Sequence, residues 1–243
     1  ILYFMLGGYI YENKELLLKN KNKIFIITLL ITIVSISYGI FVSDINKSFY
    51  SSNYLYCSLA MVMYILSIFI VSMILLYAAS TTYHTFDLSE RTNKILKKLD
   101  HCMIFVLIAG SYTPICLIVL HGRTGLMLLA LVWSIAILGI IFKLCWVTCP
   151  KWVSSVLYIA MGWVCVLAFT QILNSLPAAA FNWLLAGGII YTVGGIIYAL
   201  KLPIFNAHHK YFGSHEIFHL FVMAGSICHF IMMFEYVAVL PLA

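Results

Sequence analysis

The sequence predicts an all-α membrane protein of seven transmembrane helices, with the N-terminus cytoplasmic and the C-terminus on the opposite side. Hydrophobic residues fill 64% of the 243 positions, charged residues only 9%, and the mean hydropathy is +1.05. These values lie outside the range of soluble globular proteins. A helix needs about 20 apolar residues to cross a bilayer, and the chain contains seven apolar runs long enough to do so. We therefore expect an integral, multi-pass membrane protein.

The seven apolar runs leave no room for a separate soluble domain. Residues 1–23 are interpreted as an N-terminal juxtamembrane segment and residues 24–243 as one transmembrane domain. The opening stretch, 1–11, is apolar but too short to span, and it lacks the basic start and the cleavage site of a signal peptide. The expected spans are 24–43, 54–79, 101–120, 125–146, 152–173, 181–200 and 215–236.

Lysine and arginine are distributed unevenly between the two predicted sides. With the N-terminus inside, twelve of the 14 basic residues fall in cytoplasmic segments, and only Lys47 and Arg123 fall on the other side. Basic loops stay in the cytoplasm, so this asymmetry predicts the orientation. The net charge of +6 suits anionic lipid headgroups. We expect no nucleic-acid partner, because the chain offers no soluble surface to bind one, and the sequence does not indicate an oligomeric state.

Polar residues gather where the second run ends and the third begins. Ser80 and His84 are four residues apart and so share one face of a helix. His84 is either a functional residue or a cap at a helix C-terminus. The connector 85–99 is charged and expected to be solvated, and Asp100 stands where the third run begins, a position typical of a helix N-cap. Within that run, the stretch 109–114 contains a proline and predicts a kink.

The sharpest chemical signal lies at the start of the last run. His215 and His219 are one helical turn apart on one face, where two imidazoles can hold one metal ion. Two such histidines can also simply hydrogen-bond to neighbouring helices. His229 lies about 21 Å beyond His215 along the helix, too far to share that metal. It is expected to form either a hydrogen bond between helices or a second polar site.

The expected topology brings these groups to one membrane face. The end of the second span and the starts of the third and seventh all lie at the cytoplasmic side, so Ser80, His84, Asp100, His215 and His219 can converge. Three imidazoles and a water form the pattern of an open catalytic zinc site, and a nearby carboxylate can orient that water or take its proton. A metal also satisfies imidazoles that hydrocarbon would leave unpaired. We therefore predict a zinc site near the cytoplasmic face.

These motifs resemble those of the hemolysin III and progestin/adipoQ receptor family of seven-helix membrane proteins. The resemblance covers roughly residues 72–236, including Ser80-x-x-x-His84, Asp100 and the histidine pair of the last span. Leu-Asp-His at 99–101 and Ala-Gly-Ser-Tyr-Thr-Pro at 109–114 are more similar to the hemolysin III branch than to the hormone-receptor branch. The family's early motif, an Asn or Glu followed one turn later by His, has no counterpart here, since no His precedes His84.

The resemblance implies one zinc ion held by His84, His215 and His219. It implies that Asp100 holds the water on the metal and that Ser80 supports the site, which makes these two the expected catalytic residues. The wider group is similar to alkaline ceramidases, which implies hydrolysis of a lipid amide or ester.

Two functions stay open at the level of the sequence, which does not decide whether the protein is an enzyme. One is a zinc-dependent, ceramidase-like hydrolase that acts on a membrane lipid. The other is a receptor or a pore-forming cytolysin in which zinc is structural, although no charged stripe of helical period marks a water-filled channel. His215-Glu216-x-x-His219 also matches the metalloprotease motif, in which Glu is the general base. The family match favours Asp100 as the base instead.

Overall fold

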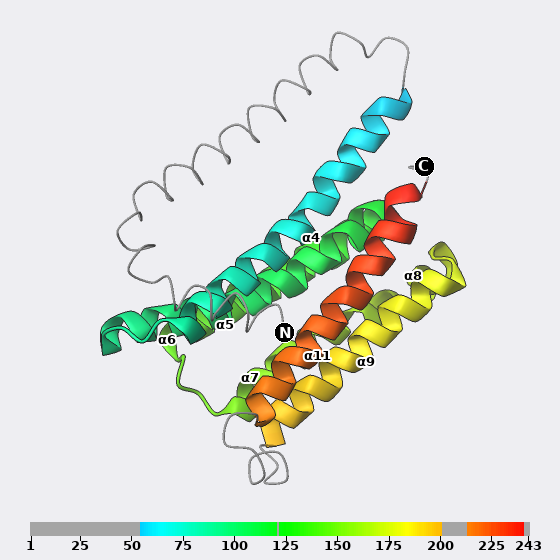
Figure 1. Ribbon diagram of the computed structural model, residues 1–243. Helices are drawn as coiled ribbons and strands as arrows, with labels where there is room; N and C mark the ends of the chain where they lie inside the picture. The colour runs from blue at the N-terminus through cyan, green and yellow to red at the C-terminus, as the bar shows by residue number, and fades with distance from the viewer. Residues whose placement is uncertain (1–53, 121, 201–212, 241–243) are drawn as a thin grey trace.

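The computed structural model describes residues 54–120, 122–200 and 213–240 as a bundle of long helices without a β-strand (Figure 1). Within these residues, six helical segments are long and apolar enough to cross a membrane. They correspond to the second through seventh predicted spans. The predicted first span, 24–43, and the segment 1–23 lie outside the described residues. The elements are α4 (Tyr54–Thr85), α5 (Glu90–Pro114), η1 (Ile115–Val119), α6 (Gly122–Cys145), α7 (Lys151–Gly162), η2 (Trp163–Ala168), α8 (Phe169–Ser175), α9 (Ala178–Leu200), α11 (Ser214–Ile231), η3 (Met232–Tyr236) and η4 (Val237–Val239).

The second and third spans are longer than their apolar runs, because polar residues continue both helices past the run. The helix α4 includes His84 in its last turn, and α5 begins at Glu90. The N-cap of α5 is Ser89, whose side chain accepts a hydrogen bond from the Thr92 backbone N–H at 3.4 Å. The prediction that Asp100 stands at a helix start is therefore wrong. Asp100 lies ten residues after Glu90, inside α5 and buried.

Three of the described helices, α5, α7 and α11, change their winding within the bundle, and at the change in α7 a neighbouring side chain bonds the backbone. At Pro114 the α-helix gives way to one π-helical segment, η1, since proline has no N–H to donate. The helix α7 continues as a 3₁₀-helix, η2, from Trp163. The Tyr112 hydroxyl inserts at that change: it donates to the Gly162 carbonyl at 2.7 Å and accepts from the Cys165 N–H at 2.8 Å. In a bilayer such partners must come from the protein, because no water supplies them.

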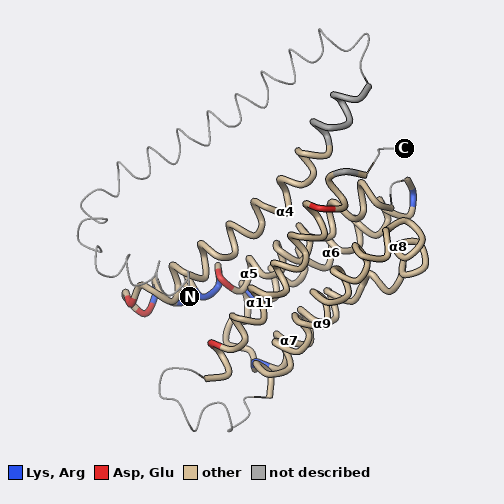
Figure 2. Tube along the Cα trace, turned by 45° about the vertical axis from the view of Figure 1, so that its right-hand side comes forward, with Lys and Arg blue, Asp and Glu red and all other residues tan. Residues whose placement is uncertain are grey.

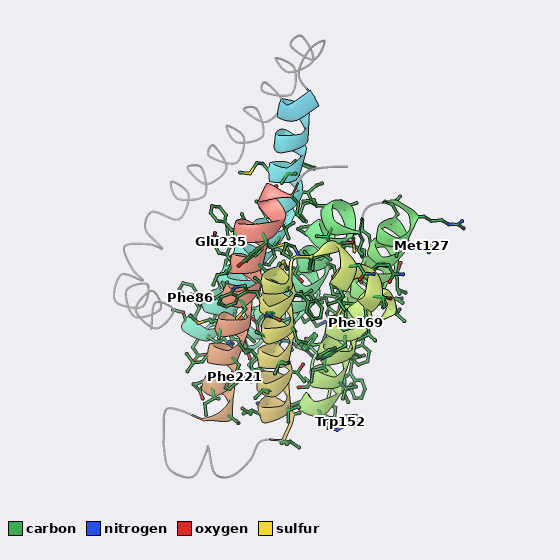
Figure 3. All side chains as sticks on the ribbon, turned by 90° about the vertical axis from the view of Figure 1, so that its right-hand side faces the viewer. Phe86, Met127, Trp152, Phe169, Phe221 and Glu235 are labelled. Carbon is green, nitrogen blue, oxygen red and sulfur yellow. The ribbon has the colours of Figure 1, made fainter. Side chains whose placement is uncertain are left out.

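The bundle is built by pairwise packing of neighbouring helices. The helix α4 packs on α5, α5 on α6, and α9 on both α7 and α11. Large buried side chains such as Phe69, Phe105 and Met232 fill the interior. The outer surface is apolar as well, with Met127 and Trp152 among its exposed side chains (Figure 3). Charged residues lie mostly near the helix ends (Figure 2). An apolar outside with charged ends is what a lipid environment requires.

Lys143 departs from this distribution. It is one of the twelve basic residues on the predicted cytoplasmic side, yet its side chain is fully buried in the last turn of α6. Its ammonium donates to the Ser154 hydroxyl at 2.5 Å and to the Cys149 sulfur at 3.0 Å. Lys143 thereby fastens the end of α6 to the start of α7, across the short connection between them.

Close approach of α4 and α5 depends on a glycine, and this gives a prediction. A Cβ at Gly110 would lie 2.7 Å from the Ser72 Cβ on α4, whereas a Cβ at Gly162 meets nothing within 4 Å. We expect Gly110→Ala to lower the free energy of unfolding by about 1–3 kcal/mol through overpacking, and Gly162→Ala to leave it nearly unchanged. Thermal unfolding of both variants in detergent measures this. Equal midpoints for the two variants would contradict the packing described.

Candidate metal centre

The first histidine of the site is positioned by the end of α4. Ser80 and His84 lie one turn apart on the last part of this helix, as their spacing predicts. His84 is exposed, whereas Ser80 is buried. The His84 ring leans toward α11 and packs edge to face on the rings of His215 and His219, with centroid distances of 4.9 and 5.2 Å.

The start of α11 positions the other two histidines. Gly213 is the N-cap, and its backbone N–H donates to the Glu216 carboxylate at 2.7 Å. This half of a capping box fixes the first turn, where His215 and His219 lie on one face with their rings tilted and the centroids 4.6 Å apart. The Glu216 carboxylate is thus engaged at the helix end rather than at the histidines.

His84, His215 and His219 form a cluster that can hold a metal ion. Their candidate ligand nitrogens all lie within 4.8 Å of one another, and the Nε2 atoms of His215 and His219 are 2.9 Å apart. Zinc bonds imidazole nitrogen at about 2.0–2.1 Å, so two ligands of a tetrahedral site are roughly 3.3 Å apart. Small movements of the three rings reach that geometry. The donor set fits zinc, although neutral imidazoles also suit copper, iron and nickel.

Asp100 and Ser80 lie beside the histidines. The Asp100 side chain is 9% exposed, and within the described residues it forms no salt bridge to lysine or arginine. Its carboxylate lies 3.5 Å from Nδ1 of His101, a ring that also contacts the Lys97 carbonyl at 2.9 Å. The Ser80 hydroxyl lies next to the carboxylate but forms no hydrogen bond of good geometry. The structure therefore brings together all five residues that the sequence singles out.

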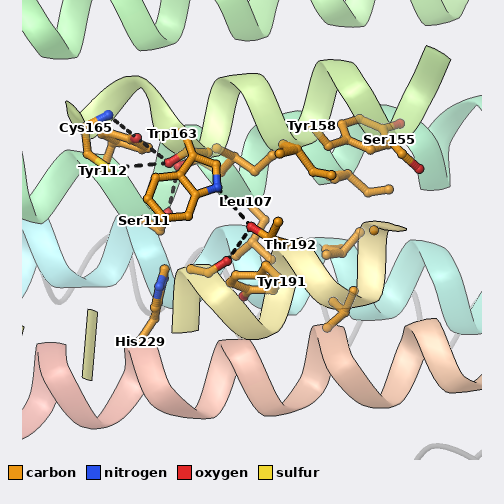
Figure 4. A pocket seen from close by; sticks show the side chains of 18 of the residues that line it. Leu107, Ser111, Tyr112, Ser155, Tyr158, Trp163, Cys165, Tyr191, Thr192 and His229 are labelled. Carbon is orange, nitrogen blue, oxygen red and sulfur yellow. Dashed lines mark hydrogen bonds between the residues drawn. The ribbon is translucent and has the colours of Figure 1, made fainter. Parts of the chain in front are cut away.

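The site opens onto an elongated, mainly apolar cavity of about 200 Å³. Asp100, His215 and His219 line one part of it. Apolar side chains such as Phe169, from the other half of the bundle, line another. Figure 4 shows part of the wall, with Tyr158 and Ser155 along α7 and His229 projecting from α11. A metal cluster at an apolar cavity is suited to a ligand with one polar end and a long hydrocarbon chain.

Comparison with known proteins identifies the family. The model of the haemolysin-III related family matches residues 23–230. The chain belongs to this family. It is 41% identical over 175 residues to the hemolysin-3 homolog of Bacillus subtilis (72% of this chain, 78% of the relative) and 44% identical over 168 residues to hemolysin-3 of Bacillus cereus (69% and 72%). The adiponectin receptor protein of Drosophila melanogaster is 26% identical over 182 residues (67% and 40%).

Membership in the haemolysin-III related family, with six apolar helices in the described residues, makes the chain an integral, multi-pass membrane protein. The predicted family resemblance and membrane location are both confirmed. The cluster of three histidines is a possible metal site, and the identity of the metal and the roles of the surrounding residues stay predictions.

Sequence reasoning gave no role to three residues that surround the site. The Tyr198 ring packs edge to face on His215, with centroids 5.6 Å apart, and the Lys151 ammonium lies 4.3 Å above the centroid of that tyrosine ring. His101 contacts Asp100. Tyrosine in a span is common, so only a register for α9 against α11 would have singled out Tyr198. His101 follows Asp100 directly, and neighbours in sequence seldom face each other on a helix.

The cluster predicts that α4 and α11 share one metal ion. We expect the purified chain to carry about one zinc per molecule, and both His84→Ala and His219→Ala to lose it, because two imidazoles bind a metal far more weakly than three. His229→Phe, which removes a histidine of the same helix outside the cluster, should retain the zinc. Elemental analysis of the folded proteins measures this. A folded, metal-free wild type, or zinc retained in both alanine variants, would contradict the cluster as a metal site.

Proposed function

We propose that this haemolysin-III related protein is a zinc-dependent hydrolase of a lipid amide or ester, with the lipid entering from the inner leaflet. The observation that carries the proposal is the continuity between the histidine cluster and the apolar cavity, which Asp100, His215 and His219 line together with residues of α7, α8 and α9. The cavity would hold the hydrocarbon chain, while the polar end lies at the cluster. Burial of the chain supplies binding energy in proportion to the apolar area covered.

In this proposal His84, His215 and His219 would hold a zinc ion, which would supply an activated water and polarise a carbonyl. Asp100 would take a proton of the attacking water and return it to the leaving amine or alcohol, and its position inside α5 holds the carboxylate in a buried site beside the cluster. The Ser80 hydroxyl donates a hydrogen bond to the oxygen that gains negative charge. Its lack of a good partner within the protein leaves it available for this role.

The metalloprotease alternative is disfavoured by the position of Glu216. As the general base of such an enzyme, this carboxylate would have to lie at the metal. It instead accepts the Gly213 N–H at the N-terminus of α11, which is a structural use. Asp100 is the carboxylate that lies beside the cluster and lines the cavity.

A receptor or a cytolysin remains the second candidate, and the relatives' names are its support. The Bacillus cereus relative is named hemolysin-3 and the Drosophila relative an adiponectin receptor protein. In either case zinc would be structural and the lipid cavity would hold a ligand without cleaving it. The two candidates differ in whether turnover depends on Asp100.

The proposed function also needs the predicted topology. We propose that residues 24–43 form the first of seven spans, which adds one to the six in the described residues. Residues 1–23 would be cytoplasmic, and the C-terminus would lie on the opposite side. The distribution of twelve of the 14 basic residues supports this orientation. It would place the metal cluster at the inner leaflet.

The proposal predicts how three substitutions affect hydrolysis. We expect Asp100→Asn to lower kcat about 10²- to 10⁴-fold, since it removes a general base, and Ser80→Ala to lower it less. Glu216→Gln, a carboxylate-to-amide change at the helix end, should leave kcat within a few-fold of wild type. Release of fatty acid from a panel of N-acyl amides and acyl esters in mixed micelles measures this.

Zinc content is determined alongside, so that loss of metal is not mistaken for loss of the base. If Glu216→Gln abolishes hydrolysis and Asp100→Asn does not, the assignment of the base is wrong. If the zinc-loaded wild type binds lipid but cleaves none of the N-acyl amides and acyl esters, the hypothesis of a receptor or cytolysin is favoured.

A further inference from the structure

Two buried polar side-chain atoms lack a hydrogen-bond partner in the described part of the chain: Ser80 Oγ and His229 Nε2. Both residues line the cavity. Ser80 lies at the metal cluster and has a role in the proposed reaction. His229 lies ten residues beyond His219 on α11, which is about 15 Å along the helix axis, and has none. Unpaired buried groups are rare in folded proteins, so His229 needs its own explanation.

The unpartnered nitrogen of His229 defines the group that can pair with it. Nε2 is buried and has no hydrogen-bond partner in the described residues, and it donates or accepts according to which ring nitrogen carries the proton. A hydroxyl can both donate and accept, so it complements either tautomer.

Three hydroxyl groups of α4, α9 and α11 are engaged with one another. Tyr77 donates to the Ser226 hydroxyl at 2.7 Å, and the Tyr191 and Ser226 hydroxyls are 2.8 Å apart. The Tyr191 ring packs edge to face on His229, with centroids 5.3 Å apart. These three hydroxyls are thus paired with one another rather than with His229. A water held at Nε2 alone would lack the two to four polar partners that buried water needs.

The opposite helix leaves room beside the ring. A Cβ at Gly187 of α9 would lie 2.6 Å from Nε2, so only glycine admits the ring there. The next residue, Gly188, lines the cavity, and a Cβ at that position meets nothing within 4 Å. Figure 4 shows the His229 ring projecting into the pocket on the side that faces Ser111 and Trp163. Nε2 itself is covered by α9, and the open space lies beside it at Gly188.

We propose that His229, with its ring tilted toward Gly188, is a second polar subsite of the cavity, which forms a hydrogen bond with a hydroxyl carried partway along the hydrocarbon chain of the bound lipid. The hydroxyl lies about 15 Å from the group held at the metal cluster. Pairing with it removes the cost of an unsatisfied buried polar group. The inference rests on the proposed function in one respect, that the occupant of the cavity is a lipid.

The test compares matched lipids on the full-length, zinc-loaded chain in detergent. Long-chain fatty acids that carry one hydroxyl at successive positions are compared with the unsubstituted acid by competition against a fluorescent fatty acid. We expect one mid-chain position to bind about 5- to 10-fold more tightly than the unsubstituted acid, the gain of one hydrogen bond. Acids with the hydroxyl near either end should show no such gain.

Three variants assign the preference to the ring. His229→Phe keeps a flat ring without an acceptor and should bind both acids alike. His229→Gln keeps an acceptor and should retain part of the preference. Ser111→Ala, on the facing wall, removes a hydroxyl that already donates to the Ile108 carbonyl at 2.8 Å and should retain all of it. Zinc content and thermal unfolding of each variant verify the fold.

The outcomes separate this proposal from the hydrolase. Equal binding of both acids to wild type, or a preference that survives His229→Phe, would overturn the subsite, even if the protein hydrolyses lipids. A preference that disappears with His229→Phe in a protein without hydrolase activity would support the subsite and count against the enzyme. If wild type binds neither acid, the cavity does not hold a fatty chain, and the subsite fails with it.

Discussion

The contact between the histidine of α4 and the histidine pair of α11 is the interaction on which the arrangement of the bundle depends. The helix α4 packs along α5, and α11 along α9, so these two pairs meet largely through side chains. His84 reaches His215 and His219 at one end, and Tyr77 reaches Ser226 further along. Long side chains that bridge two helices hold their backbones apart. Tyr77, His215 and His219 line the cavity, so some of these bridging side chains form part of its wall.

Most buried polar groups of the described helices are satisfied by side chains of the protein itself. Backbone groups freed by the change from α7 to η2 are satisfied by Tyr112, and the buried ammonium of Lys143 finds Ser154 and Cys149. In these cases a side chain of the protein supplies the hydrogen-bond partner of a buried polar group. Ser80 Oγ and His229 Nε2 depart from this pattern, and both border the cavity. Strain and unmet polarity are expected at functional sites, where a ligand supplies the missing partner.

Sequence patterns predicted the parts of the site that periodicity and topology control. A spacing of four puts His215 and His219 on one face, and the alternation of spans brings His84 and Asp100 to the same end. Helix ends could not be predicted this way, because polar residues such as Glu90 continue a helix past the apolar run. The cavity was also invisible in the sequence. Its lining residues, Phe169 for example, are apolar like core residues, and only packing decides which of them meet a neighbour and which meet space.

The number of ligands bears on whether the metal would be structural or catalytic. Structural zinc sites are closed by four protein ligands, whereas catalytic sites keep one position open. The described residues supply three imidazoles, and Glu216 is held at the helix end by Gly213. Asp100 lies beside the cluster without being part of it, which is the place of a proton acceptor rather than of a ligand. The fourth position would then face the cavity, so the chemistry of the metal and the binding of the hydrocarbon chain would be parts of one site.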